Sequence, residues 1–302
     1  MQKVSVILTT FNGANAVGNT IDSILKQESR NHLFELELIV VDDCSTDKTV
    51  SLVEQFECKL LSTETNSGGP NKGRNMGLKV ATGDYICIAD QDDVWKPEKI
   101  KTLLPYLEQT PIVSSGYTLI DTFKNKTIQR YKASSKSHIL YEKNETFLKK
   151  LTKNPSGQQA YLGSLIFSKK FKNIFFEEQF GMVDFDWILR LFHQQASIEL
   201  CDSLYIRHVE KDNLSLNETY RQNDFTYSLL TLEHYKEQYP QETIISRKRI
   251  HGSMARYYYL MGNMKKARFY FLKSPWNLKT IMYYLTSYAG SKFVKRMFNV
   301  FG

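Results

Sequence analysis

The sequence predicts an α/β protein with a parallel sheet in its N-terminal half, a less regular second half and a helical C-terminal extension. Short β-rich runs alternate with amphipathic stretches over the first 120 residues, which is the pattern of parallel strands joined by crossover helices. Polar clusters follow three of the predicted strands. Residues 243–302 contain 12 Lys or Arg and no Asp or Glu, so the C-terminal region differs in character from the rest.

Five strands are predicted in the first half from short apolar and β-branched runs. They cover residues 4–8, 36–41, 58–61, 85–89 and 112–115. Apolar residues at helical spacing predict a helix around residues 21–25 and another around residues 50–56, the second with Ser45 placed to cap it. Residues 1–120 therefore read as a nucleotide-binding half.

The second half, residues 121–215, has a looser pattern. It begins with a polar segment rich in Lys and Ser at residues 124–136 and continues with an apolar run at residues 161–167. A helix is predicted at residues 184–194, followed by two short strands at residues 198–201 and 204–208. Together the two halves form one predicted catalytic domain, and residues 216–302 form a basic, aromatic-rich helical region.

Composition favours a soluble globular chain over a disordered or fibrous one, because 42% of the 302 residues are hydrophobic and 24% are charged. The apolar runs are far shorter than the roughly 18 residues of a membrane-spanning helix, and the N-terminus lacks a signal-peptide pattern. The cysteines are widely spaced, so we expect reduced core residues rather than a metal or redox site. These features predict a cytoplasmic protein.

The polar clusters at residues 9–13, 42–45 and 90–93 each follow a predicted strand. Any one of them could be a turn or a helix cap, but ligands of open α/β sheets bind beyond the carboxyl ends of strands. The third cluster holds Asp90, Asp92 and Asp93, which repel one another unless a cation is present. Mg²⁺ or Mn²⁺ suits such a site, with phosphate oxygens completing the coordination. A substrate that carries phosphate is therefore expected.

Several motifs, in this order along the chain, resemble family 2 of the glycosyltransferases. They are VSVILTTFN, IVVDDCSTD, GRNMGL, ATGDYI and IADQDDVWKPEKI. The resemblance covers about residues 3–215 and implies the GT-A fold, with a Rossmann-like nucleotide-sugar half and an acceptor half. It also implies inverting transfer from a UDP- or dTDP-sugar, in the assembly of bacterial capsule, O-antigen or cell-wall polysaccharide.

On the donor side, the resemblance implies that the nucleotide is bound by Thr9, Phe11, Asp43, Arg74, Asp90 and Asp92. Within the family's D-x-D element, Asp90 suits the ribose and Asp92 suits a bound Mn²⁺ or Mg²⁺. His208 in LYIRHVEKDNLS is implied as a second metal-binding residue, with Arg207 as its alternative. A lone histidine is also common as an ordinary surface residue. Asp93 is a further acid, and its spacing from the next helix argues against a role as a cap.

On the acceptor side, MVDFDWILRLF resembles the family's ED motif and implies Asp184 as the catalytic base, six residues before Arg190. Val183 replaces the usual glutamate. Asp186 could bind the acceptor or could simply be an exposed acid in the first helical turn. Trp187 could stack on a sugar ring, although packing in the core suits it better. The pair Gly163 and Ser164 is similar to the family's acceptor-side turn.

Two other classes of function were weighed. A pI of about 9.1 is typical of proteins that bind nucleic acid or anionic membranes without catalysis, but the carboxylate clusters would repel nucleic acid and no nucleic-acid motif is present, so we expect no nucleic-acid partner. A sugar nucleotidyltransferase would also bind nucleotide and metal, but the N-terminal region lacks the Gly-rich basic loop that such an enzyme needs.

The basic region interleaves its cations with aromatic residues, a mixture that suits the headgroup layer of an anionic membrane. We therefore expect residues 247–302 to hold the protein on the inner face of the cell membrane, where a lipid-linked saccharide acceptor would be found. The alternative is that the aromatic residues form the core of a small helical domain and the cations form its solvated face.

Overall fold

The structure, a computed structural model, describes residues 1–121, 125–132, 136–179, 184–209 and 217–290. Val183, part of the polar segment at residues 124–136 and the last part of the basic region lie outside the described residues. The chain forms two compact units. The first comprises Met1–Phe147 and Ser156–Asn213, and the second comprises Leu148–Pro155 and Leu214–Gly302.

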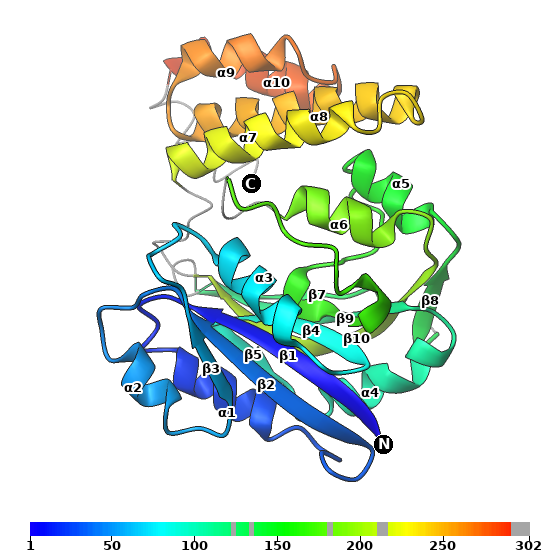
Figure 1. The fold of residues 1–302 in the computed structure, drawn as a ribbon. Coiled ribbons are helices and arrows are strands. Elements are labelled where there is room, and N and C mark those ends of the chain that lie inside the picture. Colours follow the sequence, from blue (N-terminus) through cyan, green and yellow to red (C-terminus); the bar gives the residue numbers. More distant parts are fainter. Residues whose placement is uncertain (122–124, 133–135, 180–183, 210–216, 291–302) are drawn as a thin grey trace. The chain divides into compact units, whose positions relative to one another are not determined.

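The first unit is built on one sheet (Figure 1). Its first four strands in chain order are parallel to one another, which confirms the predicted parallel sheet. They are β1 (Gln2–Thr10), β2 (Phe34–Asp42), β3 (Lys59–Ser62) and β4 (Tyr85–Asp90), and they lie side by side in the order β3-β2-β1-β4. Because they are parallel, their carboxyl ends meet at one edge of the sheet.

Beyond β4 the sheet becomes mixed. Strand β9 (Leu165–Ser168) is antiparallel to both β4 and β6 (Ile112–Asp121), and β10 (Ser197–Val209) is parallel to β6. The remaining strands are antiparallel to a neighbour: β5 (Asp93–Trp95) to β10, β7 (Lys126–Arg130) to β6 and β8 (His138–Tyr141) to β10. The prediction of two short strands after residue 197 was wrong, because register shifts around Ser203 let one strand continue through that segment.

The helices of the first unit are α1 (Val17–Leu25), α2 (Thr49–Val53), α3 (Pro70–Val80), α4 (Lys99–Leu103) and α6 (Phe185–Phe192). Helix α5 (Glu145–Leu151) begins in the first unit and ends in the second. Helix α6 confirms the helix predicted at residues 184–194. The cap predicted for Ser45 was wrong. Helix α2 begins after Lys48 with no side-chain cap, and the Ser45 hydroxyl donates a hydrogen bond to Asp42 instead.

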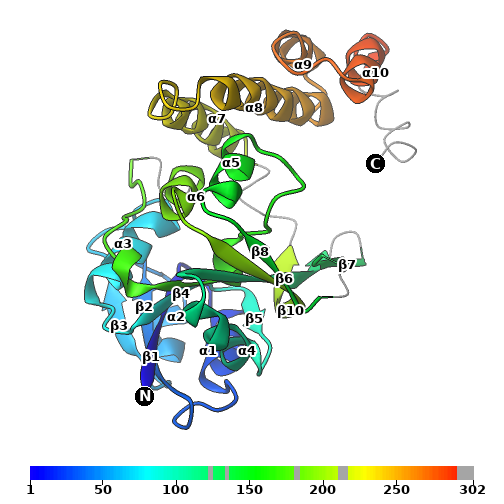
Figure 2. The ribbon, with the colours of Figure 1, turned by 90° about the vertical axis from the view of Figure 1, so that its right-hand side faces the viewer.

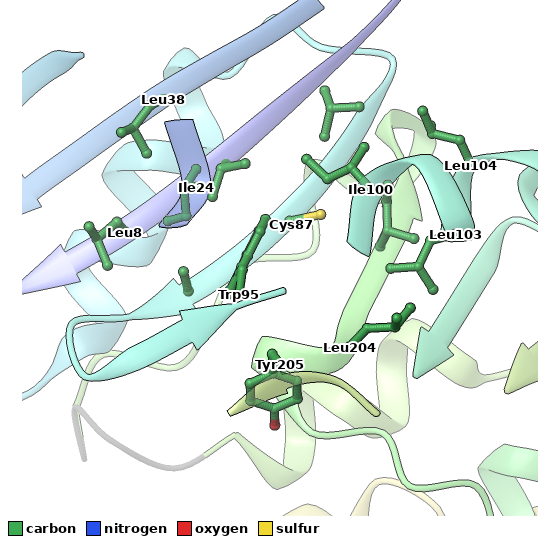
Figure 3. Close-up of a cluster of buried hydrophobic side chains, with 14 of the residues drawn as sticks. Leu8, Ile24, Leu38, Cys87, Trp95, Ile100, Leu103, Leu104, Leu204 and Tyr205 are labelled. Atoms are coloured by element: carbon green, nitrogen blue, oxygen red, sulfur yellow. The ribbon is translucent and has the colours of Figure 1, made fainter. Parts of the chain in front are cut away.

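Alternate residues of each central strand face opposite sides of the sheet. Leu8 and Cys87 pack against Ile24 of α1 and Ile100 of α4, in the cluster shown in Figure 3. On the other side, Ile7 lies so close to Gly77 of α3 that a Cβ at Gly77 would clash with it. Helices α1 and α4 therefore cover one face and α3 covers the other, where α6 also lies, as Figure 2 shows.

The second unit contains helices α7 (Glu218–Glu233), α8 (Pro240–Leu260), α9 (Met264–Phe271) and α10 (Leu278–Thr286). Asn217, Asn263 and Asn277 cap α7, α9 and α10 by accepting backbone N–H groups with their side-chain oxygens. The unit has its own core, formed by Met254, Ala255, Tyr258, Tyr259, Ala267 and Phe271. The structure thus confirms the helical C-terminal extension.

None of the four cysteines is in a disulfide bond, and of the four only Cys87 is fully buried. The prediction that all of them are core residues was therefore wrong for Cys44, Cys58 and Cys201, which are half-buried. In the part of the chain that the structure describes, no helix is long and apolar enough to cross a membrane.

Glu37 of β2 ties together three segments at the start of the sheet. Its carboxylate accepts hydrogen bonds from Ser5, from the backbone N–H of Thr82 at 2.8 Å, and from Lys3 at 3.3 Å. Burial works against ionisation, but these donors outweigh it and lower the pKa of Glu37 to about 2. A depressed pKa stabilises the fold above the unfolded-state pKa of about 4.3, and this stabilisation is lost as the pH falls towards about 2.

We therefore expect Glu37→Gln to lower the free energy of unfolding at pH 7 by about 1–3 kcal/mol, because hydrogen bonds to a charged acceptor are lost. The difference from the wild type should shrink between about pH 4 and pH 2. Urea unfolding at several pH values measures it. A difference that does not depend on pH would show that the charge of Glu37 has no part in the stabilisation.

Candidate active site

The register of the sheet brings the three polar clusters to one edge. Thr9 pairs with Asp90 on one side and with Val41 on the other, and Thr10 pairs with Asp42. The end of β1 therefore lies between the two acidic segments, as predicted from the parallel pattern. This edge is the expected place for a ligand of an open α/β sheet.

Gln91 fastens the acidic segment after β4 to the loop after β1. Its side-chain oxygen accepts hydrogen bonds from the Thr10 hydroxyl and from the backbone N–H of Phe11, both at 2.8 Å. The Thr20 hydroxyl donates to the Gln91 carbonyl at 2.7 Å. Phe11 is thereby held at the edge of the sheet with an exposed ring, which could stack against a planar base.

Asp43 is buried and anchors the loop that leads to α3. Its carboxylate accepts hydrogen bonds from the Thr63 hydroxyl at 2.8 Å and from the Ser67 hydroxyl and backbone N–H at 2.9 and 3.0 Å. The Asn66 amide is 3.3 Å away. The carboxylate thus shapes the loop around the nucleotide site that the sequence predicts, and contact with the nucleotide itself remains a prediction.

Arg74 of α3 reaches the first acid of the D-x-D element. Its guanidinium lies 2.7 Å from the Asp90 carboxylate and donates at 3.1 Å to the side-chain oxygen of Asn71. Arg74 is itself almost completely buried, whereas the Asp90 side chain is partly exposed. Asp90 therefore has a fixed cationic partner, and its open side faces solvent.

Asp93 is the buried acid of the cluster and lies in β5, opposite Arg207 of β10. Burial and the charges of Asp90 and Asp92 raise its pKa well above the usual value, and the charges of Lys99 and Arg207 oppose this rise. The prediction that Asp93 is not a helix cap is confirmed, since α4 begins at Lys99 after Glu98.

Lys99 is fully buried beneath this cluster. Its ammonium donates to the carbonyl of Gly163 and lies 3.5 Å from the ring centre of Trp95. Burial lowers its pKa to about 8. A side chain at Gly163 would clash with the Asp93 carboxylate, so Lys99, Asp93 and the Gly163–Ser164 turn form one tightly packed group.

We expect Lys99→Met to lower the free energy of unfolding by about 3–5 kcal/mol, because it leaves the buried Asp93 carboxylate without its neighbouring cation. Lys101→Met is the matched control on the same helix. Lys101 forms an exposed ion pair with Glu28, so this control should cost about 1 kcal/mol or less.

Denaturant unfolding of Lys99→Met, Asp93→Asn and the double variant tests the coupling. The loss in the double variant should be smaller than the two single losses added together, since each single change leaves one buried group uncompensated. Strictly additive losses would show that the two groups do not interact.

Asp92 differs from the other two acids. Among the described residues, no Lys, Arg or His forms an ion pair with its carboxylate, and burial together with the charge of Asp90 raises its pKa. His208 lies beside it, with Nδ1 3.1 Å from the Asp92 carbonyl oxygen. Because a carbonyl oxygen can only accept, Nδ1 carries the proton in this contact, and the predicted role of His208 as a metal-binding residue stays a prediction.

The residues around Asp92 fit a divalent cation only if a ligand supplies part of the coordination. Within the described residues, no group of three or more His, Cys, Asp or Glu side chains could hold a metal ion. One or two carboxylates completed by phosphate oxygens are, however, a usual Mg²⁺ environment. Asp90 is paired with Arg74 and Asp93 is fully buried, whereas Asp92 is half-buried and forms no ion pair with the described residues, although the charges of Arg207 and His208 act on it.

The helix of the predicted ED motif is α6. Asp184 is its N-cap residue and is exposed, and its carbonyl accepts the N–H of Ile188 at 2.9 Å. Asp186 is buried and bound to Arg190 at 2.7 Å, so its interpretation as an exposed acid was wrong, and a role in acceptor binding is untested.

Trp187 belongs to the core. Its indole N–H donates to the Ile174 carbonyl at 2.7 Å, and its ring stacks on Phe176 with centroids 4.5 Å apart. Of the two roles that the sequence left open, the structure shows packing. Phe176 also lies under Arg74, 5.3 Å from the guanidinium carbon, and its backbone bonds Asn75 at 2.7 and 2.8 Å. These contacts fix α6 against α3, the helix that carries Arg74.

The turn at Gly163 and Ser164 adjoins an aromatic residue, Tyr161, that the sequence did not single out. Ser164 donates to the Tyr161 carbonyl at 2.7 Å, and the exposed Tyr161 ring meets Tyr117 edge to face at 4.8 Å. The guanidinium carbon of Arg207 lies 5.6 Å from the Tyr161 ring centre. No local motif marks Tyr161, because Tyr117 and Arg207 come from distant strands.

Comparison with known proteins identifies the family to which this chain belongs. The sequence profile described as Glycosyl transferase family 2 matches residues 5–175, which is more than half of the chain. The chain belongs to glycosyltransferase family 2. The matched segment includes every polar cluster at the carboxyl edge of the sheet, so the resemblance of the motifs is confirmed. Membership favours a sugar-transferring enzyme over the binding protein and the nucleotidyltransferase that were weighed above.

Among curated proteins, the chain is similar to the poly(ribitol-phosphate) beta-N-acetylglucosaminyltransferase TarS of Staphylococcus aureus strain Mu50. They are 39% identical over 113 residues, which are 36% of this chain and 19% of TarS. It is also 36% identical over 124 residues to TuaG of Bacillus subtilis strain 168, described as a putative teichuronic acid biosynthesis glycosyltransferase. That match covers 39% of this chain and 47% of TuaG, so the chain matches less than half the length of either relative.

Solved structures agree on the fold. The crystal structure of S. aureus TarS 1–349 matches with a TM-score of 0.63 at 19% identity, covering 99% of this chain and 92% of that one. The same protein in complex with UDP-GlcNAc matches with a TM-score of 0.58 at 17% identity, over 98% and 91% of the two chains. The predicted GT-A fold with C-terminal helices is therefore confirmed.

Proposed function

We propose that this glycosyltransferase transfers one sugar, with inversion, from a nucleotide diphosphate sugar to a saccharide acceptor of a cell-surface polymer. The observation that carries the proposal is the placement of Asp90, Asp92 and Asp93 directly after β4 at the carboxyl edge of the sheet, with Asp92 forming no ion pair among the described residues. The UDP and UDP-GlcNAc complexes of TarS support a UDP-sugar as the donor. A dTDP-sugar is the alternative donor.

The donor would lie across the ends of β1, β2 and β4. Thr9, Phe11 and Asp43 surround the expected nucleoside position, and Arg74 holds Asp90 at 2.7 Å near the ribose. Asp92, with His208 beside it, would hold Mn²⁺ or Mg²⁺. The cation would supply charge neutralisation for the leaving diphosphate.

Asp184 is the proposed base. It is exposed at the first turn of α6, where its carboxylate can take the proton from an acceptor hydroxyl as that oxygen attacks the anomeric carbon. The bond from that carbon to the diphosphate oxygen breaks in the same step, and the electron pair leaves with the nucleoside diphosphate. One displacement inverts the anomeric centre, so no covalent enzyme intermediate is needed.

The acceptor is proposed to be lipid-linked and used at the cytoplasmic face of the membrane. Two observations support this. TarS is described as acting on poly(ribitol-phosphate) and TuaG as acting in teichuronic acid biosynthesis, and the last 60 residues of this chain contain no acid. The turn at Gly163 and Ser164, together with Asp186, remains the proposed acceptor side.

The experiment that tests the function is nucleoside diphosphate release. The full chain is incubated with UDP- and dTDP-sugars, each with Mn²⁺, Mg²⁺ or EDTA. We expect slow metal-dependent release of UDP, or of dTDP, from one donor, and faster release when a matching acceptor is added. Release of pyrophosphate from a nucleoside triphosphate and a sugar phosphate would instead indicate a nucleotidyltransferase.

A further inference from the structure

Helix α10 exposes one continuous apolar face. Leu278, Ile281, Met282 and Leu285 are all exposed, Leu278 at 76% and Leu285 at 63% of full accessibility. Their spacing of three, one and three residues places them on a single side of the helix. An isolated exposed leucine is unremarkable, but four apolar side chains on one face of a nine-residue helix are not.

The opposite side of α10 fastens the helix to its own unit. Thr280 is buried, and Tyr283 meets Tyr259 edge to face at 4.8 Å and stacks on Phe271 at 6.0 Å. Both partners belong to the core of the second unit. Helix α10 is therefore packed against the core of its unit on one side and exposes its apolar residues on the other.

The surroundings of this face are aromatic and basic. Trp276 and Tyr288 flank the helix and are exposed, and Trp276 also meets Tyr284 edge to face at 5.6 Å. Lys273 and Lys279 are exposed on either side of Trp276. Residues 243–290 contain no Asp or Glu, so no acid in this stretch offsets these cations.

We propose that the Leu278–Ile281–Met282–Leu285 face of α10, flanked by Trp276 and Tyr288, inserts into the headgroup layer of an anionic lipid surface. An apolar helix side between aromatic and lysine residues is the pattern of helices that lie in the membrane interface. The acid-free surroundings complement anionic lipid, and α10 is too short to span a bilayer.

This inference rests on the proposed location at the membrane, and it assigns lipid contact to different residues from those that the sequence suggested. The sequence attributed membrane binding to the aromatic residues of the whole basic region, among them Tyr258 and Tyr259. Both are buried in the helical core, which is the alternative that the sequence left open. The aliphatic side of α10 takes their place as the lipid-contacting surface.

Vesicle flotation of the full chain, without donor or acceptor, tests the proposal independently of catalysis. The probe is phosphatidylcholine vesicles with or without about one third phosphatidylglycerol. We expect binding to the anionic vesicles only, and weaker binding as salt rises, because screening shortens the reach of the lysines. The double variant Leu278→Glu/Leu285→Glu should bind at least about tenfold more weakly, since it places two charges on the inserted side.

Leu230→Glu is the matched control. Leu230 is 51% exposed on α7 of the same unit, so its variant should bind vesicles like the wild type. Both variants change exposed side chains and should keep the wild-type melting temperature. Equal loss of binding in the two variants would overturn the proposal, as would equal binding to both vesicle types. Concentration-dependent self-association that is lost in the double variant, without vesicle binding, would show that a second copy covers this face.

Discussion

Asp184→Asn is expected to abolish sugar transfer while leaving donor binding almost unchanged. A general base ordinarily contributes about 10² to 10⁴ in rate, and an asparagine of the same shape cannot accept the proton. Asp184 is exposed at the N-cap of α6, where asparagine is as favourable as aspartate, so the change should not unfold the helix. Steady-state transfer and calorimetric titration with UDP measure the two quantities.

Asp22→Asn is the control for this experiment, because Asp22 is a partly exposed acid on α1 that forms an ion pair with a neighbouring lysine, Lys26. It should transfer sugar at the wild-type rate. If Asp184→Asn keeps more than about a tenth of the wild-type turnover, the base is another residue, since a general base supplies at least about 10². Loss of UDP binding together with turnover would mean that Asp184 shapes the donor site.

Most of the donor half could be predicted from the sequence, because its signals are local. The four strands at the start of the sheet are short β-branched runs, and parallel strands bring their polar ends together without further information. The family resemblance then assigned roles that no spacing rule would give. The helices of the C-terminal region were also predictable from composition, although their bounds were not.

What the sequence could not show depends on contacts between distant segments. Strand β5 has three residues and no pattern of its own, and it is recognised only by its antiparallel pairing with β10, in which Asp93 lies opposite Arg207. The sequence around Lys99 does not show that this lysine is buried or that its ammonium donates a hydrogen bond to the Gly163 carbonyl. Burial, the feature that distinguishes Asp93 from Asp90 and Asp92, is likewise a property of the folded chain alone.

Asp186 illustrates the same limit on α6. The sequence favoured packing in the core for Trp187, as the structure shows, but the interpretation of Asp186 as an exposed acid was wrong, because α6 is buried along most of its length. The segment at Phe176 is held by Asn75 of α3. The ED motif therefore predicted helix α6 correctly, but it could not show that Asp186 is buried.

Asp92→Asn is expected to remove activity without removing stability. The raised pKa of Asp92 means that its charge opposes folding above that pKa, because burial and the neighbouring Asp90 both disfavour the ionised form. A neutral asparagine removes this cost at neutral pH. In the absence of metal and nucleotide, the variant should therefore melt at the wild-type temperature or slightly above it.

When metal and nucleotide are present, the wild type should instead be more stable than Asp92→Asn. With Mn²⁺ and UDP at about 100 times the dissociation constant, the wild type should gain about 2.7 kcal/mol of stability, whereas the variant, which lacks the proposed metal ligand, should gain little. EDTA should remove the gain from the wild type and should also stop transfer. Thermal unfolding of both proteins with UDP alone, with Mn²⁺ alone and with both measures the effect. Equal stabilisation of the two proteins, or full turnover in excess EDTA, would mean that Asp92 does not hold a cation, and the charge on the leaving diphosphate would then have to be balanced by side chains such as Arg207.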